Sequence, residues 1–204
     1  MGLTTAAYRL GVFGGAFDPP HLAHVALARA AIDQLRLDEL RVFPTGQAWH
    51  KARALSPGEH RLAMAREAFA GLPKAVVDDR ELRREGPTYT IDTLRQLRAE
   101  RPDAELLLVI GADQAEALHG WRESEAIMQL ATLAVAARAR PDPDAPPFDA
   151  STLPGGRYVA VELPTMPVSA TQIRSRVQAG QDIAELVPAG VARYIARHHL
   201  YSRT

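Results

Sequence analysis

The sequence predicts an α/β fold with a mainly parallel sheet and helices on both of its faces. Short apolar runs typical of strands alternate with helical patterns along all 204 residues. The run at 105–110, ELLLVI, is apolar almost throughout, as is typical of a central parallel strand covered on both faces. Two apolar runs end in glycine followed by a helical pattern, at Gly14–Gly15 and at Gly111. Since ligands bind beyond the carboxyl ends of parallel strands, we expect a site at that edge.

The first predicted unit joins a strand at 8–13 to a helix at 21–35 through the turn Gly14–Gly15. Glycine permits backbone angles closed to other residues and lets the main chain approach a ligand closely. Asp18 is a predicted helix N-cap, and the two prolines that follow it fit the first helical positions.

His21 and His24 are three residues apart, so they are predicted to share one face in the first turn of that helix. A helix start carries free N–H groups and partial positive charge, and anions bind there. Strand, glycine turn and paired histidines together indicate a site for a phosphorylated ligand. The alternative is an ordinary α/β unit in which the histidines are structural.

A second candidate phosphate site is the segment VSATQIRSRV at 168–177. Ser169 and Thr171 would place hydroxyls and free backbone N–H groups at a helix start. Arg174 follows Thr171 by three residues and can reach back toward the same phosphate as a forked donor. The alternative for this segment is a capped surface helix with a solvated arginine.

The remaining chain supplies the other expected elements. Ser56 and Glu59 have capping-box spacing, Thr88 or Thr90 could cap a helix, and 80–87 is predicted to be a charged connector. A segment rich in proline and glycine at 140–156 is a predicted surface loop. Strands are predicted at 40–43, 75–78, 131–137 and 158–163, and helices at about 57–70, 88–97, 123–130, 169–177 and 188–198.

Composition limits the function classes. Lys and Arg total 24 and Asp and Glu total 24, and this zero net charge argues against a general nucleic-acid or anionic-membrane surface. The absence of cysteine excludes disulfides and thiolate metal sites. No apolar run approaches the about 18–20 residues of a membrane span, so a cytoplasmic protein is expected. The length suits one domain over 1–204, with a C-terminal helical part at about 168–204 packed on it.

Several common site motifs are missing from the sequence. It contains no G-x-x-x-x-G-K-[ST], no G-x-G-x-x-G after the first strand, and no G-x-S-x-G. A P-loop, a dinucleotide fingerprint and a nucleophile elbow are therefore unsupported. A metal site formed by His21, His24 and a distant carboxylate such as Asp113 would have to be an oxygen–nitrogen site.

Both phosphate motifs resemble those of the nucleotidylyltransferase superfamily. GGAFDPPHLAH is similar to its GG-T-FDP-x-H-x-GH signature, and VSATQIR to its I-S-S/A-T-x-I-R motif. Ala16 replaces the usual Thr, Ala23 replaces the usual Gly, and ARARP around Arg138 is a looser match. Four further segments look like the bacterial nicotinate-nucleotide adenylyltransferases: His50–Lys51, PTYTIDTL at 87–94, VIGAD at 109–113, and Gly120–Trp121.

The resemblance implies a Rossmann-like nucleotidyltransferase fold that transfers an adenylyl group from ATP to nicotinate mononucleotide in NAD biosynthesis. Mg²⁺ would bridge phosphate oxygens instead of binding the protein directly, and His21, His24 and Arg174 would be catalytic. The implied ATP-binding residues are Gly14, Gly15, Ala16, Phe17, His21, His24, Gly111, Asp113, Arg138, Ser169, Thr171 and Arg174. The implied mononucleotide-binding residues are His50, Lys51, Tyr89, Thr90 and Trp121.

Two kinds of alternative stay open. One is another small adenylyltransferase, acting on nicotinamide mononucleotide or a pantetheine phosphate, although the segment at Tyr89–Thr90 and Trp121 argues against the latter. The other is a non-catalytic nucleotide-binding protein of the same fold, which the intact histidines and Arg174 argue against. The sequence leaves the oligomeric state open, with a homo-oligomer as one alternative.

Overall fold

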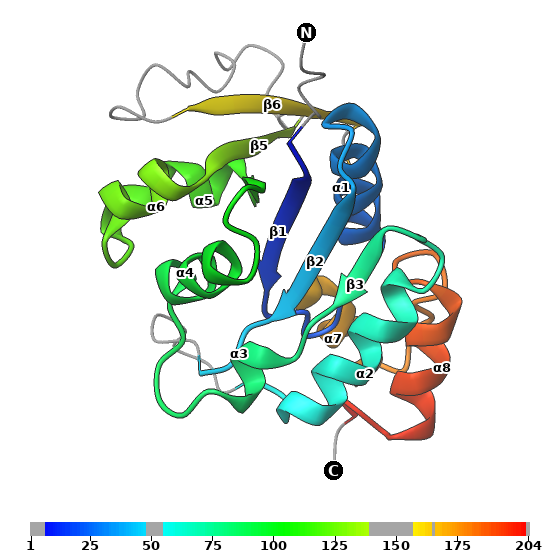
Figure 1. Ribbon diagram of the computed structural model, residues 1–204. Coiled ribbons are helices and arrows are strands. Elements are labelled where there is room, and N and C mark those ends of the chain that lie inside the picture. The colour runs from blue at the N-terminus through cyan, green and yellow to red at the C-terminus, as the bar shows by residue number, and fades with distance from the viewer. Residues whose placement is uncertain (1–6, 48–54, 139–156, 165, 203–204) are drawn as a thin grey trace, which may run out of the picture.

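The computed structural model describes residues 7–47, 55–138, 157–164 and 166–202. Within these ranges six strands form one sheet in the order β3-β2-β1-β4-β5-β6, and each neighbouring pair is parallel (Figure 1). The expected parallel sheet is confirmed. The strands are β1 (Arg9–Gly15), β2 (Glu39–Pro44), β3 (Ala75–Val77), β4 (Glu105–Gly111), β5 (Thr132–Arg138) and β6 (Tyr158–Leu163).

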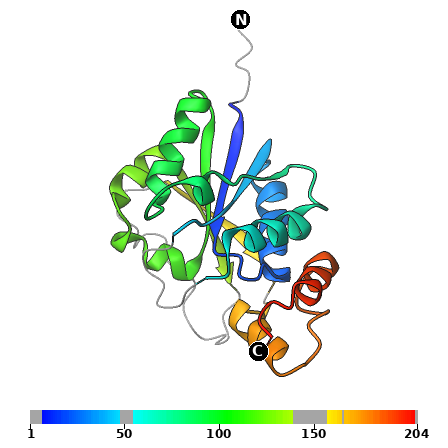
Figure 2. The same cartoon turned by 90° about the horizontal axis from the view of Figure 1, so that it is seen from below.

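Helices cover both faces of the sheet, as expected. Figure 2 shows α1, α2 and α8 on one face and α4, α5 and α6 on the other. The helices are α1 (Leu22–Gln34), α2 (Gly58–Phe69), α3 (Arg80–Arg83), α4 (Thr90–Glu100), α5 (Ala112–Glu116), α6 (Ser124–Leu130), α7 (Ala170–Gln178) and α8 (Ala189–Arg197), with a 3₁₀ turn η1 (Leu118–Gly120).

The position of β4 in the middle of the sheet explains why its sequence shows no alternation of apolar and polar residues. Leu107 and Val109 pack into the core shared with α1, α2, α7 and α8. Leu106, Leu108 and Ile110 pack into the core shared with α4, α5 and α6. All of these side chains are at most 6% exposed. Burial of each stabilises the fold by about 1.5–3 kcal/mol, so both faces of the strand require apolar residues.

The chain reverses its direction of travel across the sheet beside β1. It runs from β1 outward through β2 to β3, then returns past β1 to add β4 and the strands beyond. In such sheets the ligand crevice lies at the carboxyl ends of the two strands flanking this reversal. Those ends are Gly14–Gly15 on β1 and Gly111 on β4. A Cβ added at Gly14 or Gly111 would meet nothing within 4 Å, so both positions border open space.

Helices α1, α7 and α8 end in the same way. The residues after their C-caps, Arg36, Gly180 and His199, have φ of 49°, 67° and 50°. At α8 the Leu200 N–H donates to the Ile195 carbonyl at 3.1 Å, which satisfies a carbonyl at the end of the helix. The residue with positive φ reverses the chain sharply at each of these helix ends. After α8 the chain runs back toward the carboxyl edge of the sheet.

The predicted N-caps of the first two long helices are wrong, although the expected helix starts at 21 and about 57 lie within one residue of the observed starts. α1 has His21, not Asp18, as its N-cap, so both prolines precede the helix. The predicted capping box at Ser56 does not form, because α2 begins at Gly58 with Pro57 as its N-cap. Both differences have the same physical reason, because the Asp18 carboxylate accepts the Ser56 N–H at 3.1 Å. This tertiary contact uses the carboxylate that would have capped α1 and the backbone N–H that a capping box would have joined to Glu59.

The segment between β3 and α4 also differs from expectation. The predicted charged connector contains α3, whose Glu81 is buried and accepts the Thr93 hydroxyl at 2.7 Å. Burial raises the pKa of Glu81 to about 7, although the Thr93 hydrogen bond acts in the opposite direction. Neither Thr88 nor Thr90 caps α4, since its N-cap is Tyr89 and Thr88 is buried. The predicted loop at 140–156 lies outside the described residues.

Candidate active site

The two histidines form a stacked pair at the start of α1. Their ring centroids are 3.7 Å apart with an interplanar angle of 28°, as the three-residue spacing predicts. The His21 backbone N–H donates to His24 Nδ1 at 3.2 Å. Because Nδ1 accepts this bond, a neutral His24 carries its proton on Nε2. The arrangement therefore fixes one tautomer and makes His24 Nε2 a hydrogen-bond donor.

A floor of buried aromatic rings orients His24. The edge of Phe17 meets the His24 ring at a centroid distance of 5.1 Å and an angle of 77°. Phe17 is 1% exposed and contacts Phe13 and Phe69 edge to face. A Cβ on Gly15 would lie 2.9 Å from the Phe17 ring, so glycine is required for this close approach. The rings leave His24 little freedom to rotate.

The start of α7 supplies hydroxyls and the arginine predicted for phosphate binding. Ser169 is the N-cap and accepts the Gln172 N–H at 3.2 Å. Arg174 Nη2 donates to the Thr171 hydroxyl at 3.0 Å, and Nη1 donates to the Asp18 carbonyl at 2.7 Å. The last bond joins residues 156 apart in sequence. The α7 motif and the segment leading into the histidines are therefore brought together.

Asp18 is buried and contacts three separate segments of the chain, whereas the sequence predicts only a helix cap at this position. It is 3% exposed. One carboxylate oxygen accepts the Tyr201 hydroxyl at 2.6 Å, and the other accepts the Ser56 N–H. Burial and the adjacent Asp18 raise the pKa of Tyr201 well above its usual range, so the phenol remains a proton donor. No local sequence signal marks Tyr201, because its partner lies 183 residues earlier.

Arg61 on α2 braces the same region and was also missed. It is 3% exposed, and its guanidinium donates to the carbonyls of Ser56, Ala16 and Thr45 at 2.9, 3.0 and 2.7 Å. Burial lowers the pKa of Arg61 while the nearby Asp18 charge opposes the shift. With only two lysines in the chain, arginine is its ordinary surface cation, so one arginine in a helical pattern carried no signal.

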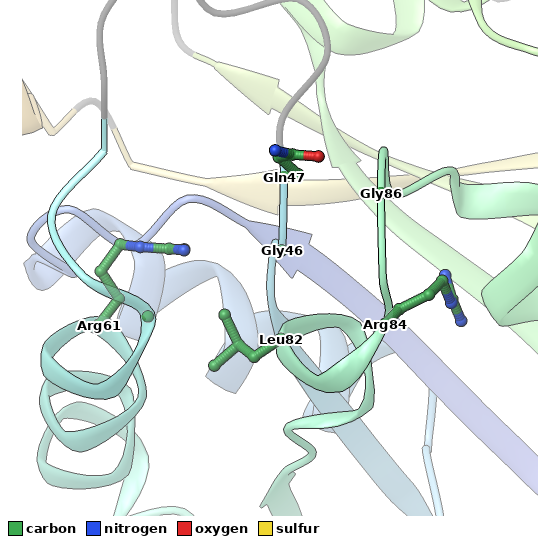
Figure 3. A pocket seen from close by; sticks show the side chains of 7 residues that line it. Gly46, Gln47, Arg61, Leu82, Arg84 and Gly86 are labelled. Atoms are coloured by element: carbon green, nitrogen blue, oxygen red, sulfur yellow. The ribbon is translucent and has the colours of Figure 1, made fainter.

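A cavity of about 330 Å³ lies on the other side of Arg61. Figure 3 shows Arg61 and Leu82 turned toward the space between α2 and α3, and Arg84 turned away from it. Arg84 instead donates to the Gln96 side chain at 2.8 Å and Thr93 at 3.3 Å. Among the predicted ATP- and mononucleotide-binding residues that the structure describes, none lines this cavity.

The residues predicted to bind the mononucleotide ring lie on the opposite face of the sheet from the histidines. Tyr89 and Trp121 are partly buried and pack against the core shared with α4, α5 and α6. The Arg122 guanidinium lies 4.6 Å from the Tyr89 ring centroid, which brings the segment after η1 next to the start of α4. Thr90 is the first residue of α4. A positive charge therefore lies beside the Tyr89 ring.

Other predicted residues are placed less completely. Gly111 is the N-cap of α5, and Asp113 is exposed in the first turn of that helix. Arg138 is the last residue of β5, but its side chain lies outside the described part of the structure. The same holds for all of His50 and Lys51.

The described residues show neither a metal-binding group nor a membrane-spanning helix. In the ranges that the structure describes, no three or more His, Cys, Asp or Glu residues gather as a metal-binding group. His21, His24 and Asp113 are therefore not assembled as a ligand set there. Among the described helices, none combines the length and apolar character needed to cross a bilayer.

Comparison with known proteins identifies the family. A family model described as cytidylyltransferase-like matches residues 12–176. A protein from Albidiferax ferrireducens named a probable nicotinate-nucleotide adenylyltransferase is 55% identical, over 95% of this chain and 98% of that protein. A protein of the same name from Bordetella petrii is 46% identical, over 95% and 98%. The chain belongs to the nicotinate-nucleotide adenylyltransferase family.

Solved structures support the fold of this adenylyltransferase family member. The Plasmodium falciparum nicotinic acid mononucleotide adenylyltransferase complexed with NaAD has a TM-score of 0.76 at 20% identity, covering 95% of this chain and 97% of that one. A putative nicotinate-nucleotide adenylyltransferase from Vibrio parahaemolyticus has a TM-score of 0.69 at 19% identity, covering 97% of each. The expected Rossmann-like nucleotidyltransferase fold is confirmed.

Arg174→Lys is expected to weaken ATP binding by about tenfold and mononucleotide binding by less than about twofold. A guanidinium takes a phosphate with two parallel hydrogen bonds, whereas an ammonium acts as a point charge. Separate calorimetric titrations of the two nucleotides measure both effects. Arg176→Lys, two residues along α7, is the matched control and should change neither affinity. Equal weakening of both nucleotides by Arg174→Lys would contradict a role in ATP binding.

Proposed function

We propose that this chain transfers the adenylyl group of ATP to nicotinate mononucleotide, giving nicotinate adenine dinucleotide and pyrophosphate in NAD biosynthesis. The observation that carries the proposal is the hydrogen bond between Arg174 and the Asp18 carbonyl. It brings two helix starts suited to phosphate next to the carboxyl end of β1. Membership of the family and the names of its curated relatives support the same reaction.

The reaction needs no covalent enzyme intermediate. A 5′-phosphate oxygen of the mononucleotide attacks the α-phosphorus of ATP, the new P–O bond forms, and the bond to the pyrophosphate oxygen breaks. Catalysis then depends on positioning two polyanions and stabilising charge on phosphoryl oxygens. His24 donates from Nε2 to such an oxygen, with His21 beside it. Arg174 and the exposed hydroxyls of Ser169 and Thr171 hold the β and γ phosphates.

The two nucleotides approach from opposite faces of the sheet. ATP lies over the start of α1 and the start of α7, and the pyridine ring of the mononucleotide lies beside Tyr89 and Trp121. Their phosphates meet between the ends of β1 and β4, where the chain order reverses. We assign the whole of 1–204 to one domain, since Ile173 of α7 and Val191 of α8 pack into the same core as α1 and α2.

We further propose that Mg²⁺ enters with the ATP phosphates. Magnesium retains several waters and is bound by few protein groups, so an ion held mainly by the ATP phosphates needs few protein ligands. The exposed carboxylate of Asp113 is suited to holding a metal-bound water. When bound, the ion neutralises charge on the phosphate oxygens. We propose small-molecule substrates and a cytoplasmic location, and the zero net charge argues against a general nucleic-acid or anionic-membrane partner.

A pyrophosphate-release assay tests the reaction class. Purified protein is incubated with ATP, Mg²⁺ and one acceptor at a time: nicotinate mononucleotide, nicotinamide mononucleotide or phosphopantetheine. Release with nicotinate mononucleotide and formation of the dinucleotide is the expected result. Release with phosphopantetheine alone would replace the proposed acceptor, and no release with any acceptor would indicate a nucleotide-binding protein without this activity.

Nicotinate mononucleotide is expected to be used about ten- to a hundredfold more efficiently than the nicotinamide form. A carboxylate only accepts hydrogen bonds, whereas an amide brings two donors of its own. Thr90 and the backbone near Trp121 would supply donors, and the Arg122 charge beside Tyr89 favours an anionic ring substituent. An unpaired buried donor costs about 1–3 kcal/mol, which sets the size of the effect. Values of kcat/KM for the two mononucleotides measure it, and equal values would contradict acid selectivity.

A further inference from the structure

We propose that Tyr201 is a positioning residue for the nucleotide site, acting through Asp18. Its hydroxyl would hold the segment between β1 and α1 in position. The position of this segment determines where the histidine pair lies and where the Asp18 carbonyl, which accepts from Arg174, lies. The proposal rests on the proposed adenylyl transfer, because ATP is the ligand whose binding the positioning would serve. Tyr201 lies outside both phosphate motifs, and nothing in its local sequence marks it.

The turn after α8 is shaped to deliver this side chain. His199 and Tyr201 both have positive φ, at 50° and 63°, a conformation uncommon for residues with a side chain. The reversal brings the Tyr201 ring against the core beneath α1 and α2. It also places the hydroxyl 2.6 Å from Asp18 Oδ1. An uncommon backbone conformation is thus retained where the side chain makes a buried, charge-assisted hydrogen bond.

Asp18 transmits the position of Tyr201 to two separate parts of the site. Its carboxylate is held by Tyr201 on one oxygen and by the Ser56 N–H on the other. Its carbonyl accepts Arg174 Nη1, and its chain leads through two prolines directly to His21. A shift of Asp18 therefore moves the acceptor of Arg174 and the start of α1 together.

Burial makes the hydroxyl difficult to replace. Asp18 is 3% exposed, so a carboxylate oxygen that loses the Tyr201 donor has little access to bulk water. A shift of the segment would relieve this loss, and such a displacement would disturb the site. The raised pKa of Tyr201 keeps the phenol protonated, so its hydroxyl remains a donor to Asp18.

Tyr201→Phe tests the proposal because it removes the hydroxyl and keeps the ring in the core. We expect KM for ATP to rise about tenfold while KM for nicotinate mononucleotide changes less than about twofold. We also expect faster amide exchange in the segment 16–24, measured by mass spectrometry without substrates. This second readout does not depend on turnover, so it judges the positioning role even if the wild-type chain fails to catalyse the proposed reaction.

Tyr194→Phe, on α8 and seven residues before Tyr201, is the matched control. Its hydroxyl lies 3.0 Å from His60 Nδ1, so the substitution also removes one half-buried hydroxyl contact between α8 and α2. It should leave both KM values and the exchange of 16–24 unchanged. The proposal is overturned if Tyr201→Phe behaves like Tyr194→Phe, or if it raises both KM values equally. It is also overturned if its only effect is a lower melting temperature.

Discussion

His24→Ala is expected to lower kcat by about 10²–10³-fold while the melting temperature stays within a few degrees of wild type. Loss of one preorganised donor to a developing oxyanion costs about 2.7–4 kcal/mol in the barrier. The structure provides the preorganisation, because Nδ1 accepts the His21 N–H and the Phe17 edge fixes the ring. Nε2 is thereby left as a donor. Steady-state kinetics and melting curves on the same preparation measure both quantities.

His60→Ala is the control for this substitution. His60 is the third residue of α2, as His24 is the third residue of α1, and both imidazoles are half-buried. His60 contacts Tyr194 and the ring of His198 outside the nucleotide site. The control should lose stability and keep its rate per folded molecule. A His24→Ala protein with the same pattern would show that His24 is structural.

Arg61→Met is expected to reduce the free energy of unfolding by about 3–5 kcal/mol. The substitution removes a positive charge close to the buried Asp18 and removes the donors to the carbonyls of Ala16, Thr45 and Ser56. Methionine fills part of the space but donates nothing. Urea unfolding followed by circular dichroism measures the loss as a lower midpoint at constant slope.

Arg66→Met separates this effect from the general loss of an arginine on α2. Arg66 is exposed, so its replacement should change the free energy of unfolding by less than about 0.5 kcal/mol. Similar losses from the two substitutions would mean that the buried guanidinium of Arg61 contributes no more than a solvated one. The two variants share a helix, a charge change and a new side chain, so burial is the variable compared.

The strands were the part of the fold best predicted from sequence. β6 spans 158–163 as expected, and β4 extends the expected 105–110 by one residue. The β4 signal comes from burial of nearly every residue, whereas β6 is an edge strand in which only Val161 is buried and is marked instead by its alternating apolar residues. The helix caps were less predictable because a local cap and a tertiary contact compete for the same polar group. Asp18 and Ser56 each look like caps in the sequence, and each is used in the contact between them.

Some residues of the candidate site could also be predicted from the sequence, and others could not. The histidine pair depends on three-residue spacing within one helix, so its stacking could be predicted from the sequence. Arg174 could be predicted because it shares a helix turn with Thr171. Arg61 and Tyr201 could not, since their partners lie in other segments and their residue types are ordinary at those positions. Ala16 stands where members of the nucleotidylyltransferase superfamily usually carry Thr. Arg61 donates to the backbone carbonyl of Ala16, and the side-chain type at that position does not reveal such a contact.

The distance of 183 residues between Asp18 and Tyr201 has a consequence for how the protein is made. At about 5–20 residues per second, a ribosome needs about 10–40 s to add the second partner after the first. During that interval the nascent β1–α1 segment has neither Arg174 nor Tyr201 to hold it. Nucleotide that binds only the completed site can stabilise the chain by mass action only after the turn that carries Tyr201 has left the ribosome. The β1–α1 segment must therefore fold without help from substrate until that turn has formed.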